Sequence, residues 1–201
     1  GGKISLLGND ITKATIRNRS KSGISHIPED RHKHGLILDF NLAQNLVLQR
    51  YWEPQFQRNG FIKNHEVNAY AEKLIEQYDI RSGQGHGTVV RSMSGGNQQK
   101  VCLAKAFAVN PKLLFVSEPT RGIDVGAKSL VLNALRKYNE ESGTTIVMIS
   151  SELEELRSIC DRIAIISDGK VFGTLPATAP SAEFGLLMVG QTSAHAQGGE
   201  V

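Results

Sequence analysis

Hydrophobic positions after residue 94 alternate between helical and strand spacing, which is the pattern of an α/β protein. The apolar segment from about Asn97 to Val109 predicts a helix, and the short run Leu113–Val116 predicts a buried strand. A second amphipathic helix is predicted to end at Gly143. One face of that helix carries Leu130, Val131, Ala134, Leu135 and Tyr138. We expect both helices to pack against the sheet.

The alternation of strands and helices continues toward the C-terminus. Thr145–Ile149 is rich in β-branched residues and predicts another buried strand, and Glu152–Ser158 predicts a helix. Two short apolar runs flank Asp168 and Gly169, which is typical of a β-hairpin turn. Residues 191–201 are small and polar, so we expect a flexible tail there.

The pattern before residue 92 divides into two regions. Residues 1–38 predict short strands and loops. Residues 39–91 predict a mostly helical subdomain, because apolar side chains recur there at the spacing of one helix face. The recurring positions are Val67, Tyr70, Ala71, Leu74, Ile75 and Tyr78. We therefore expect an α/β core from 1–38 and 92–190, with the helical subdomain between them.

Composition narrows the class of protein further. The 201 residues are 40% hydrophobic and 21% charged, with a net charge of +3, so a disordered chain is excluded and nucleic-acid binding is weakly supported. Cys102 and Cys160 have neither metal-ligand spacing nor a disulfide framework, and we expect buried structural thiols. No apolar run has the length of a membrane helix.

The strongest local motif is the stretch Ser94-Gly95-Gly96-Asn97-Gln98, placed directly before a predicted helix. Two glycines allow a ligand to approach the backbone closely, and the free amides at the start of a helix favour an anion. The stretch also suits an ordinary glycine turn with Ser94 as helix N-cap. Phosphate binding and simple capping both fit this motif.

A second candidate is Glu118, which directly follows the predicted strand Leu113–Val116 and Ser117. The C-terminal edge of a buried parallel strand is where α/β proteins place ligand chemistry, and a carboxylate there can orient or deprotonate water. A solvated glutamate at the end of a strand is the alternative.

Together these segments resemble the nucleotide-binding domain of ABC transporter ATPases. Ser94–Val101 is similar to the signature motif of that family, Leu113–Glu118 to its Walker B strand, and Pro119–Asp124 to its D-loop region. The D-loop form and the stretch Ile27–Arg31 resemble the second nucleotide-binding half of importers for simple sugars and nucleosides. The likeness runs from about residue 3 to residue 190 and implies a P-loop NTPase fold, ATP and Mg²⁺.

The sequence departs from this family at several positions. No Gly-Lys pair has the spacing of a Walker A phosphate loop, so we expect a second half that lacks this loop and is inactive by itself. Ser117 stands where Walker B usually has aspartate, and Glu29 stands where the Q-loop has glutamine. Ser151 stands at the switch histidine, where Ser151 and Glu154 also suit a helix capping box. The resemblance thus implies a weakened ATP site of the chain's own.

The resemblance also implies a role for each residue. Glu118 and Ser151 would be the catalytic positions, and Ser117 and Glu29 would neighbour the metal. Ser94, Gly95, Gly96, Asn97, Gln98 and Asp124 would contact nucleotide, the signature residues doing so across a dimer of nucleotide-binding domains. Further implied partners are transmembrane permease subunits at the cytoplasmic face of the membrane and, indirectly, a substrate-binding protein. Nucleic acid is not an expected partner.

The sequence also allows two alternative functions and two weaker candidate sites. The chain could be a non-hydrolytic regulatory or assembly module, or an ABC ATPase that acts on nucleic acid. The cluster Arg31–His34 could contact phosphate or metal, although such charged runs are usually solvated. Tyr51, Trp52 and Phe56 could belong to a surface for the permease or to the core.

Overall fold

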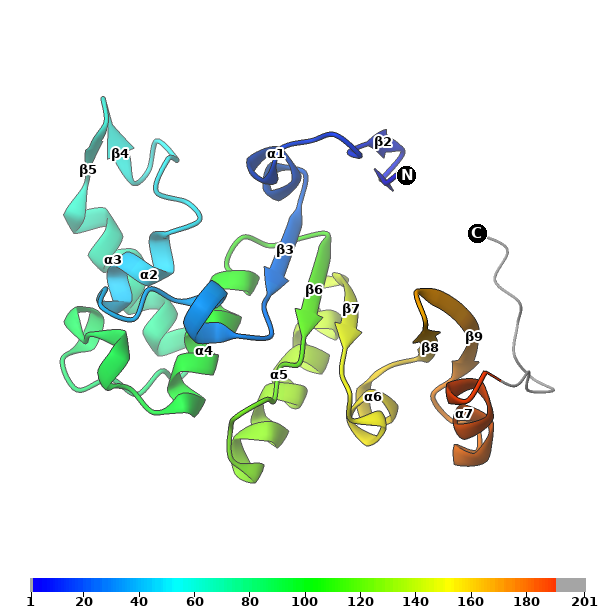
Figure 1. The fold of residues 1–201 in the computed structure, drawn as a ribbon. Coiled ribbons are helices and arrows are strands. Elements are labelled where there is room, and N and C mark those ends of the chain that lie inside the picture. Colours follow the sequence, from blue (N-terminus) through cyan, green and yellow to red (C-terminus); the bar gives the residue numbers. More distant parts are fainter. Residues whose placement is uncertain (1, 191–201) are drawn as a thin grey trace. The chain divides into compact units, whose positions relative to one another are not determined.

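The structure is a computed structural model that describes residues 2–190, and it divides into two compact units at Ile149/Ser150. The first unit is built on a three-stranded parallel sheet in the order β3 (Ile24–Ile27), β6 (Leu113–Ser117) and β7 (Thr145–Ile149) (Figure 1). The α/β prediction is confirmed. The predicted tail, 191–201, lies outside the described residues.

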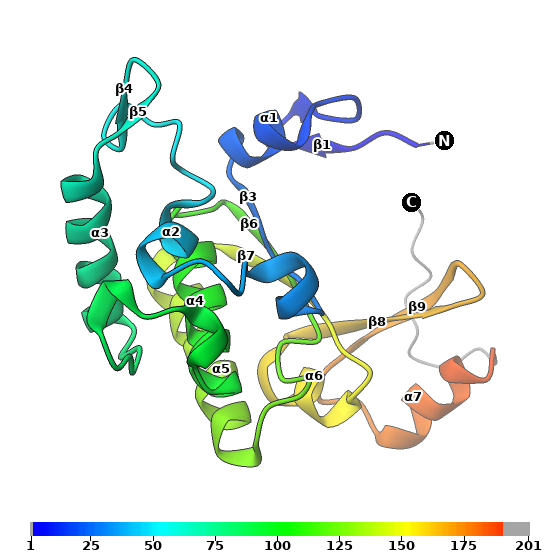
Figure 2. The same cartoon turned by 60° about the vertical axis from the view of Figure 1, so that its left-hand side comes forward.

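Two helices, α4 (Gly95–Phe107) and α5 (Val125–Ser142), lie side by side against this sheet (Figures 1 and 2). The rings of Phe107 and Tyr138 stack between them with centroids 4.0 Å apart. Both helices were predicted. Leu130 was expected on the buried face of α5 but is 61% exposed, because the buried stripe runs through Val131 and Leu135.

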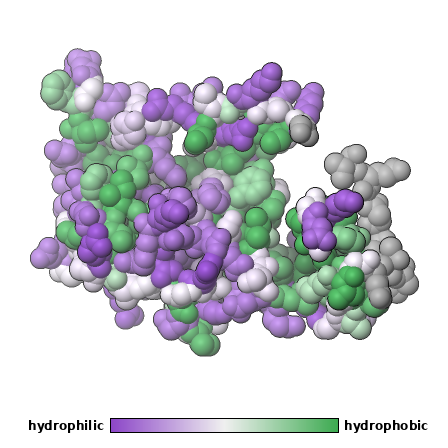
Figure 3. All heavy atoms as spheres, viewed as in Figure 1, coloured by the Kyte–Doolittle hydropathy of each residue, from purple (hydrophilic) through white to green (hydrophobic). Residues whose placement is uncertain are grey.

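Strand β7 differs from its prediction as a buried strand. In the described part of the chain it pairs only with β6, so it lies at the edge of the sheet. Val147 is 41% exposed and Ile149 is 56% exposed. The sphere view from the same side shows apolar surface at the position that β7 has in Figure 1 (Figure 3). The β-branched composition predicted strand β7, but it could not show whether a neighbouring strand pairs with each of its edges.

The first residues contain a helix that the sequence did not predict. A hairpin of β1 (Ser5–Leu6) and β2 (Asn9–Asp10) precedes α1 (Ile16–Lys21). Thr15 caps α1 by accepting a hydrogen bond from the amide of Asn18. The helix buries none of its residues, so no hydrophobic periodicity marks it and the prediction of strands and loops alone was wrong there.

The predicted helical region contains α2 (Leu42–Val47) and α3 (Asn64–Gln77), which pack together, and two short 3₁₀ turns. It also contains an unpredicted hairpin of β4 (Gln57–Arg58) and β5 (Phe61–Ile62). Phe56 is fully buried, with its ring 4.9 Å from that of Tyr70. It therefore belongs to the core and not to an exposed surface.

The second unit contains α6 (Leu153–Ile159), the antiparallel pair β8 (Arg162–Ser167) and β9 (Lys170–Pro176), and α7 (Ser181–Met188). Its core gathers Ile163, Ile165, Leu175, Ala177, Ala179, Phe184 and Leu187. The predicted hairpin is confirmed, since Asp168 and Gly169 at the turn both have positive φ, 47° and 71°. No helix between residues 2 and 190 combines the length and apolarity needed to cross a membrane.

Candidate functional site

The turn before α4 places Ser94 at the surface. Ser94 is the N-cap of α4 and is exposed, with its hydroxyl 3.4 Å from the amide nitrogen of Asn97. The amide of Gln98 donates to the carbonyl of Ser94 at 2.9 Å. The amides of Gly95 and Gly96 belong to the first helical turn, which offers no intrahelical acceptor. The capping interpretation is thus confirmed, and it leaves amides suited to an anion.

The next two polar residues of the motif serve the fold. Asn97 accepts a hydrogen bond from the amide of Arg81 at 2.9 Å. Gln98 is 5% exposed, and both polar atoms of its side chain have a hydrogen-bond partner. Its Oε1 lies 2.7 Å from Nε2 of His32, and its own Nε2 donates to the carbonyl oxygen of Val90 at 3.1 Å. Contact of Asn97 or Gln98 with ATP stays a prediction, while their packing roles are visible.

Asp124 marks a second helix start beside the first. Its Oδ1 accepts from the amide of Ala127 at 2.9 Å and caps α5. A methyl group built on Gly96 would lie 3.5 Å from Cβ of Ala127, so the first turns of α4 and α5 are in contact. The positive ends of two helix dipoles therefore lie together at this surface. That arrangement favours a bound anion, although the predicted D-loop role of Asp124 is not tested by it.

The predicted metal neighbours Glu29 and Ser117 line one hollow of about 590 Å³ in the first unit. Three cationic side chains, those of Arg31, Lys33 and Arg121, line it with them. The carboxylate of Glu29 is engaged by the guanidinium of Arg121 in an ion pair. Glu29 is therefore charge-paired in this state, and a metal ion would have to compete with Arg121 for it.

Glu118 lies at the C-terminal end of β6, as predicted, and its backbone is unusual. Its amide donates to the carbonyl of Ile149 at 2.8 Å, and its φ is +44°, in the left-handed region that non-glycine residues seldom adopt. Such a conformation costs on the order of 1 kcal/mol. Five other non-glycine residues of the described chain also have positive φ, so this conformation alone assigns no function to Glu118.

Ser151 lies in the second unit, where the predicted capping box of Ser151 and Glu154 is wrong because α6 begins one residue later. The N-cap of α6 is Glu152, whose side chain makes no capping bond. The hydroxyl of Ser150 accepts from the amide of Glu152 at 3.0 Å and donates to Glu155 at 3.1 Å. These bonds precede the helix but are not a capping box, so the expected box of Ser151 and Glu154 is not formed. Ser151 itself is exposed, and its role at the switch position stays a prediction.

Arg31 entered the sequence-based prediction only within the stretch Ile27–Arg31 and the charged cluster Arg31–His34, and the structure places it between three segments. Arg31 opens a single π-helical turn, Arg31–Gly35, and donates from Nη1 to the carbonyl of Arg121 at 2.9 Å and from Nη2 to that of Gly122 at 3.0 Å. A methyl group on Gly95 would come within 3.0 Å of Nη2. No sequence spacing links residue 31 to 95 and 121, so only the fold reveals this junction.

The histidines around Arg31 form no metal centre. Among residues 2–190, no cluster of three or more His, Cys, Asp or Glu side chains is suited to hold a metal ion. Asp30 accepts from the amides of His32 and Lys33, and the Lys33 bond is the main reason that the pKa of Asp30 is lowered. The metal-binding interpretation of Arg31–His34 is not supported, and these residues instead stabilise a turn.

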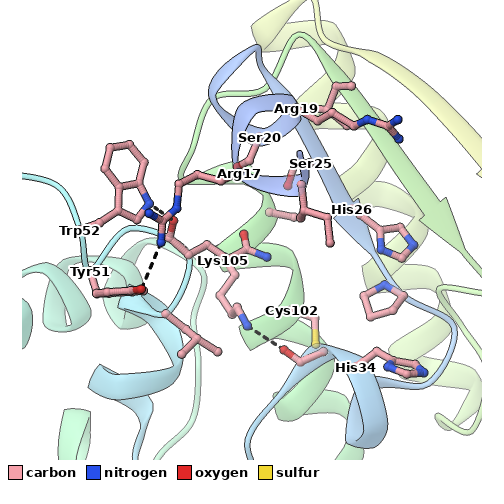
Figure 4. Close-up of a pocket in the computed structure, with 17 residues that line it drawn as sticks. Arg17, Arg19, Ser20, Ser25, His26, His34, Tyr51, Trp52, Cys102 and Lys105 are labelled. Atoms are coloured by element: carbon pink, nitrogen blue, oxygen red, sulfur yellow. Dashed lines mark hydrogen bonds between the residues drawn. The ribbon is translucent and has the colours of Figure 1, made fainter. Parts of the chain in front are cut away.

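A second hollow, of about 620 Å³, is lined by segments from α1, β3, α4 and the residues after α2 (Figure 4). Its cationic or protonatable lining residues are Arg17, Arg19, His26, His34 and Lys105, and no carboxylate lines it in the described chain. Arg17 reaches toward Tyr51, with Nη2 3.3 Å from the phenolic oxygen. Burial lowers the pKa of Lys105, whose ammonium donates to the carbonyl of Gly35 at 2.6 Å.

Comparison with known proteins places this geometry in context. The family model described as ABC transporter matches residues 1–121. The nucleoside import ATP-binding protein NupA of Lactococcus lactis subsp. cremoris is 42% identical over 190 residues, covering 94% of this chain and 37% of that protein. The guanosine import ATP-binding protein NupO of Bacillus subtilis is 40% identical over 196 residues, covering 97% of this chain and 38% of that protein. The chain spans somewhat over a third of these relatives.

A ribose importer and a solved structure extend the comparison. The ribose import ATP-binding protein RbsA of Streptococcus agalactiae is 38% identical over 174 residues, covering 87% of this chain and 35% of that protein. A dimeric ATP-binding cassette, solved in a post-hydrolysis state with ADP and Pi, superposes with a TM-score of 0.71 at 21% identity, over 89% of this chain and 75% of that chain. This structural likeness establishes the fold.

Proposed function

The chain belongs to the ABC transporter family, and from this premise we propose that it is a nucleotide-binding module of an ATP-driven importer. In this proposal the turn Ser94–Gly96 contacts the phosphates of an ATP that is anchored on a second nucleotide-binding module. That module can lie on the same polypeptide or on a partner. The imported substrate is a simple sugar or a nucleoside, since the relatives are named for nucleoside, guanosine and ribose import.

One observation carries the proposal: Ser94 is exposed at the start of α4, beside the start of α5. First-turn amides and two helix dipoles offer hydrogen bonds and positive potential to an anion that arrives from outside the unit. A triphosphate satisfies both. Had this turn been buried, the motif could serve only the fold.

The chain's own site is proposed to turn over slowly or not at all. The hydroxyl of Ser117 holds the water shell of Mg²⁺ less strongly than a carboxylate does, and Glu29 is paired with Arg121. In this proposal Glu118 orients water from the C-terminal end of β6. Glu118 and Ser151 therefore remain the candidate catalytic positions of a weakened site.

The residues of this chain are better suited to bind a nucleotide at the signature turn, Ser94–Gly96, than to hold a metal ion in a site of their own. Gly95 and Gly96 would hold phosphate oxygens with their amides, and Ser94 would add a hydroxyl. Mg²⁺, when bound with ATP, would neutralise phosphate charge in the complete site. What this chain contributes is position and hydrogen bonding at the phosphates.

The test of this function is ATP hydrolysis by the assembled ATPase, with its second nucleotide-binding module and with Ser94→Arg. An arginine there would occupy the phosphate position, so we expect hydrolysis to fall at least tenfold. Ser5→Arg is the matched control, because Ser5 is exposed in the strand β1. Hydrolysis that survives Ser94→Arg unchanged contradicts the proposal.

The basic hollow beside Tyr51 and Trp52 is proposed as the docking surface for the permease, at the cytoplasmic face of the membrane. Its lining is cationic and aromatic and lacks carboxylates, so it complements a short segment that carries an acidic side chain. We expect Arg17→Glu to weaken co-purification of the permease at least fivefold, and Arg162→Glu, an exposed control on β8, to leave it unchanged. Equal retention with Arg17→Glu contradicts this surface. The substrate-binding protein would act through the permease.

A further inference from the structure

We propose that Arg31 is a positioning residue for the signature turn, and that its guanidinium fixes Ser94–Gly96 relative to the Glu29 loop and the 121–122 turn. The inference rests on the proposed function, because it concerns how the turn is held while it contacts ATP. It gives a role to Arg31, which the resemblance described above names only as the last residue of the stretch Ile27–Arg31.

The hydrogen bonds of Arg31 define a fork and not a single contact. Nη1 and Nη2 bond to the carbonyls of two successive residues, Arg121 and Gly122, at 2.9 and 3.0 Å. A planar guanidinium can satisfy two such acceptors together, whereas an ammonium is a point donor. Gly122 has a φ of +67°, so the turn that presents these carbonyls uses a conformation suited to glycine.

The same guanidinium lies against the signature turn. A methyl group on Gly95 would meet Nη2 at 3.0 Å and the carbonyl of Gly122 at 3.6 Å. Since both Nη atoms are tied to carbonyls, Arg31 cannot withdraw without losing hydrogen bonds. The absence of a side chain at residue 95 therefore lets the start of α4 lie directly against the fork.

The loop that carries Arg31 reaches α4 at a second point and also reaches the 121–122 turn through a charge pair. His32 lies 2.7 Å from Oε1 of Gln98, one turn further along α4. Glu29 pairs with the side chain of Arg121, whose carbonyl accepts from Arg31. Three segments distant in sequence are thus joined, so a displacement of the Glu29 loop displaces the signature turn.

The contacts of Arg31 depend on the geometry of its guanidinium and not on its positive charge. Its two Nη atoms meet carbonyls, and its buried Nε has no hydrogen-bond partner in the described residues. A residue that served only as a positive charge near phosphate would be replaceable by lysine. A guanidinium that fixes geometry through two hydrogen bonds would not be replaceable by lysine. An Arg31→Lys substitution therefore distinguishes the two roles.

The experiment measures steady-state ATP hydrolysis by the assembled ATPase with Arg31→Lys and Arg31→Met. Because ATP is anchored on the other module, we expect kcat to fall about tenfold in both variants while KM for ATP changes less than twofold. Arg162→Met, on an exposed arginine of β8, is the control and should match the parent chain. Urea unfolding followed by the fluorescence of Trp52 verifies that each variant folds.

The outcomes separate this inference from the function on which it rests. If Ser94→Arg abolishes hydrolysis while Arg31→Lys keeps the parental kcat, the positioning role is wrong and the proposed function stands. A rise in KM at unchanged kcat also overturns it, because Arg31 would then bind nucleotide. If Ser94→Arg itself has no effect, the proposed function fails first. Should Arg31→Met not fold, Arg31→Lys, which keeps the charge and the aliphatic stem, decides alone.

Discussion

Truncation of Gln98 tests whether the signature helix depends on the bonds seen in its interior. Gln98→Ala removes a side chain that is 5% exposed and bonds to His32 at 2.7 Å and to the carbonyl of Val90 at 3.1 Å. Each neutral hydrogen bond contributes about 1 kcal/mol net, and the lost buried methylene adds about 0.8 kcal/mol. The better helix propensity of alanine returns a few tenths of a kcal/mol. The expected loss is about 2–3 kcal/mol.

The assay is urea unfolding of the 201-residue chain, followed by tryptophan fluorescence. Trp52 is the single tryptophan of the sequence and lies in the first unit, so the signal reports the unit that contains α4. With a slope of about 2–3 kcal/mol per molar urea, the midpoint should fall by about 1 M. The two units need not unfold together, and a local reporter avoids that complication.

The matched control is Gln77→Ala, the same substitution at an exposed position of α3. It should change the free energy of unfolding by less than about 0.5 kcal/mol. If Gln98→Ala is no more destabilising than Gln77→Ala, then Gln98 does not hold the helix in the way described. Its predicted contact with ATP would then gain weight over its packing role.

Four further perturbations have defined outcomes. Asp124→Ala should lower the thermal unfolding free energy by about 1 kcal/mol through loss of the α5 cap, while Asp124→Asn should retain most of it. Gly143→Ala should cost about 1–2 kcal/mol in the same scan because φ is +66°, whereas Gly83→Ala, in open space without a positive φ, should be neutral. Burial raises the pKa of Cys102 from 9.0 to about 11, so a thiol reagent at pH 8 should label Cys160 first and Cys102 only upon unfolding. Because the Cys102 pKa is higher in the folded chain, its contribution to the free energy of unfolding should be intact below pH 9 and decline as the pH rises through 11.

The parts of the fold that follow a strong local pattern could be predicted from the sequence. The helices α4 and α5, the strand β6 and the hairpin at Asp168–Gly169 all have either apolar periodicity or a turn dipeptide. Helix α1 has neither, because it buries no residue and depends on the cap at Thr15. Short elements without a buried face leave little trace in hydrophobic pattern.

Contacts between segments that are distant in the sequence could not be predicted, for a different reason. Arg31 meets Arg121 and Gly122 some ninety residues away, and only the parallel pairing of β3 with β6 brings their C-terminal ends to one edge of the sheet. Glu29 was singled out by its likeness to a motif, but its pairing with Arg121 could not be read from that likeness. The motif therefore identified the region, and the fold supplied its internal bonds.

The most direct test of the central claim is calorimetric titration of Mg-ATP. The claim is that this chain contributes one side of a nucleotide site whose phosphate anchor lies on another module. We expect the 201-residue chain alone to give no binding heat at ATP concentrations that saturate the protein with both modules present. Tight, stoichiometric binding of Mg-ATP by the chain alone would contradict the claim, because it would then hold the triphosphate without a second module.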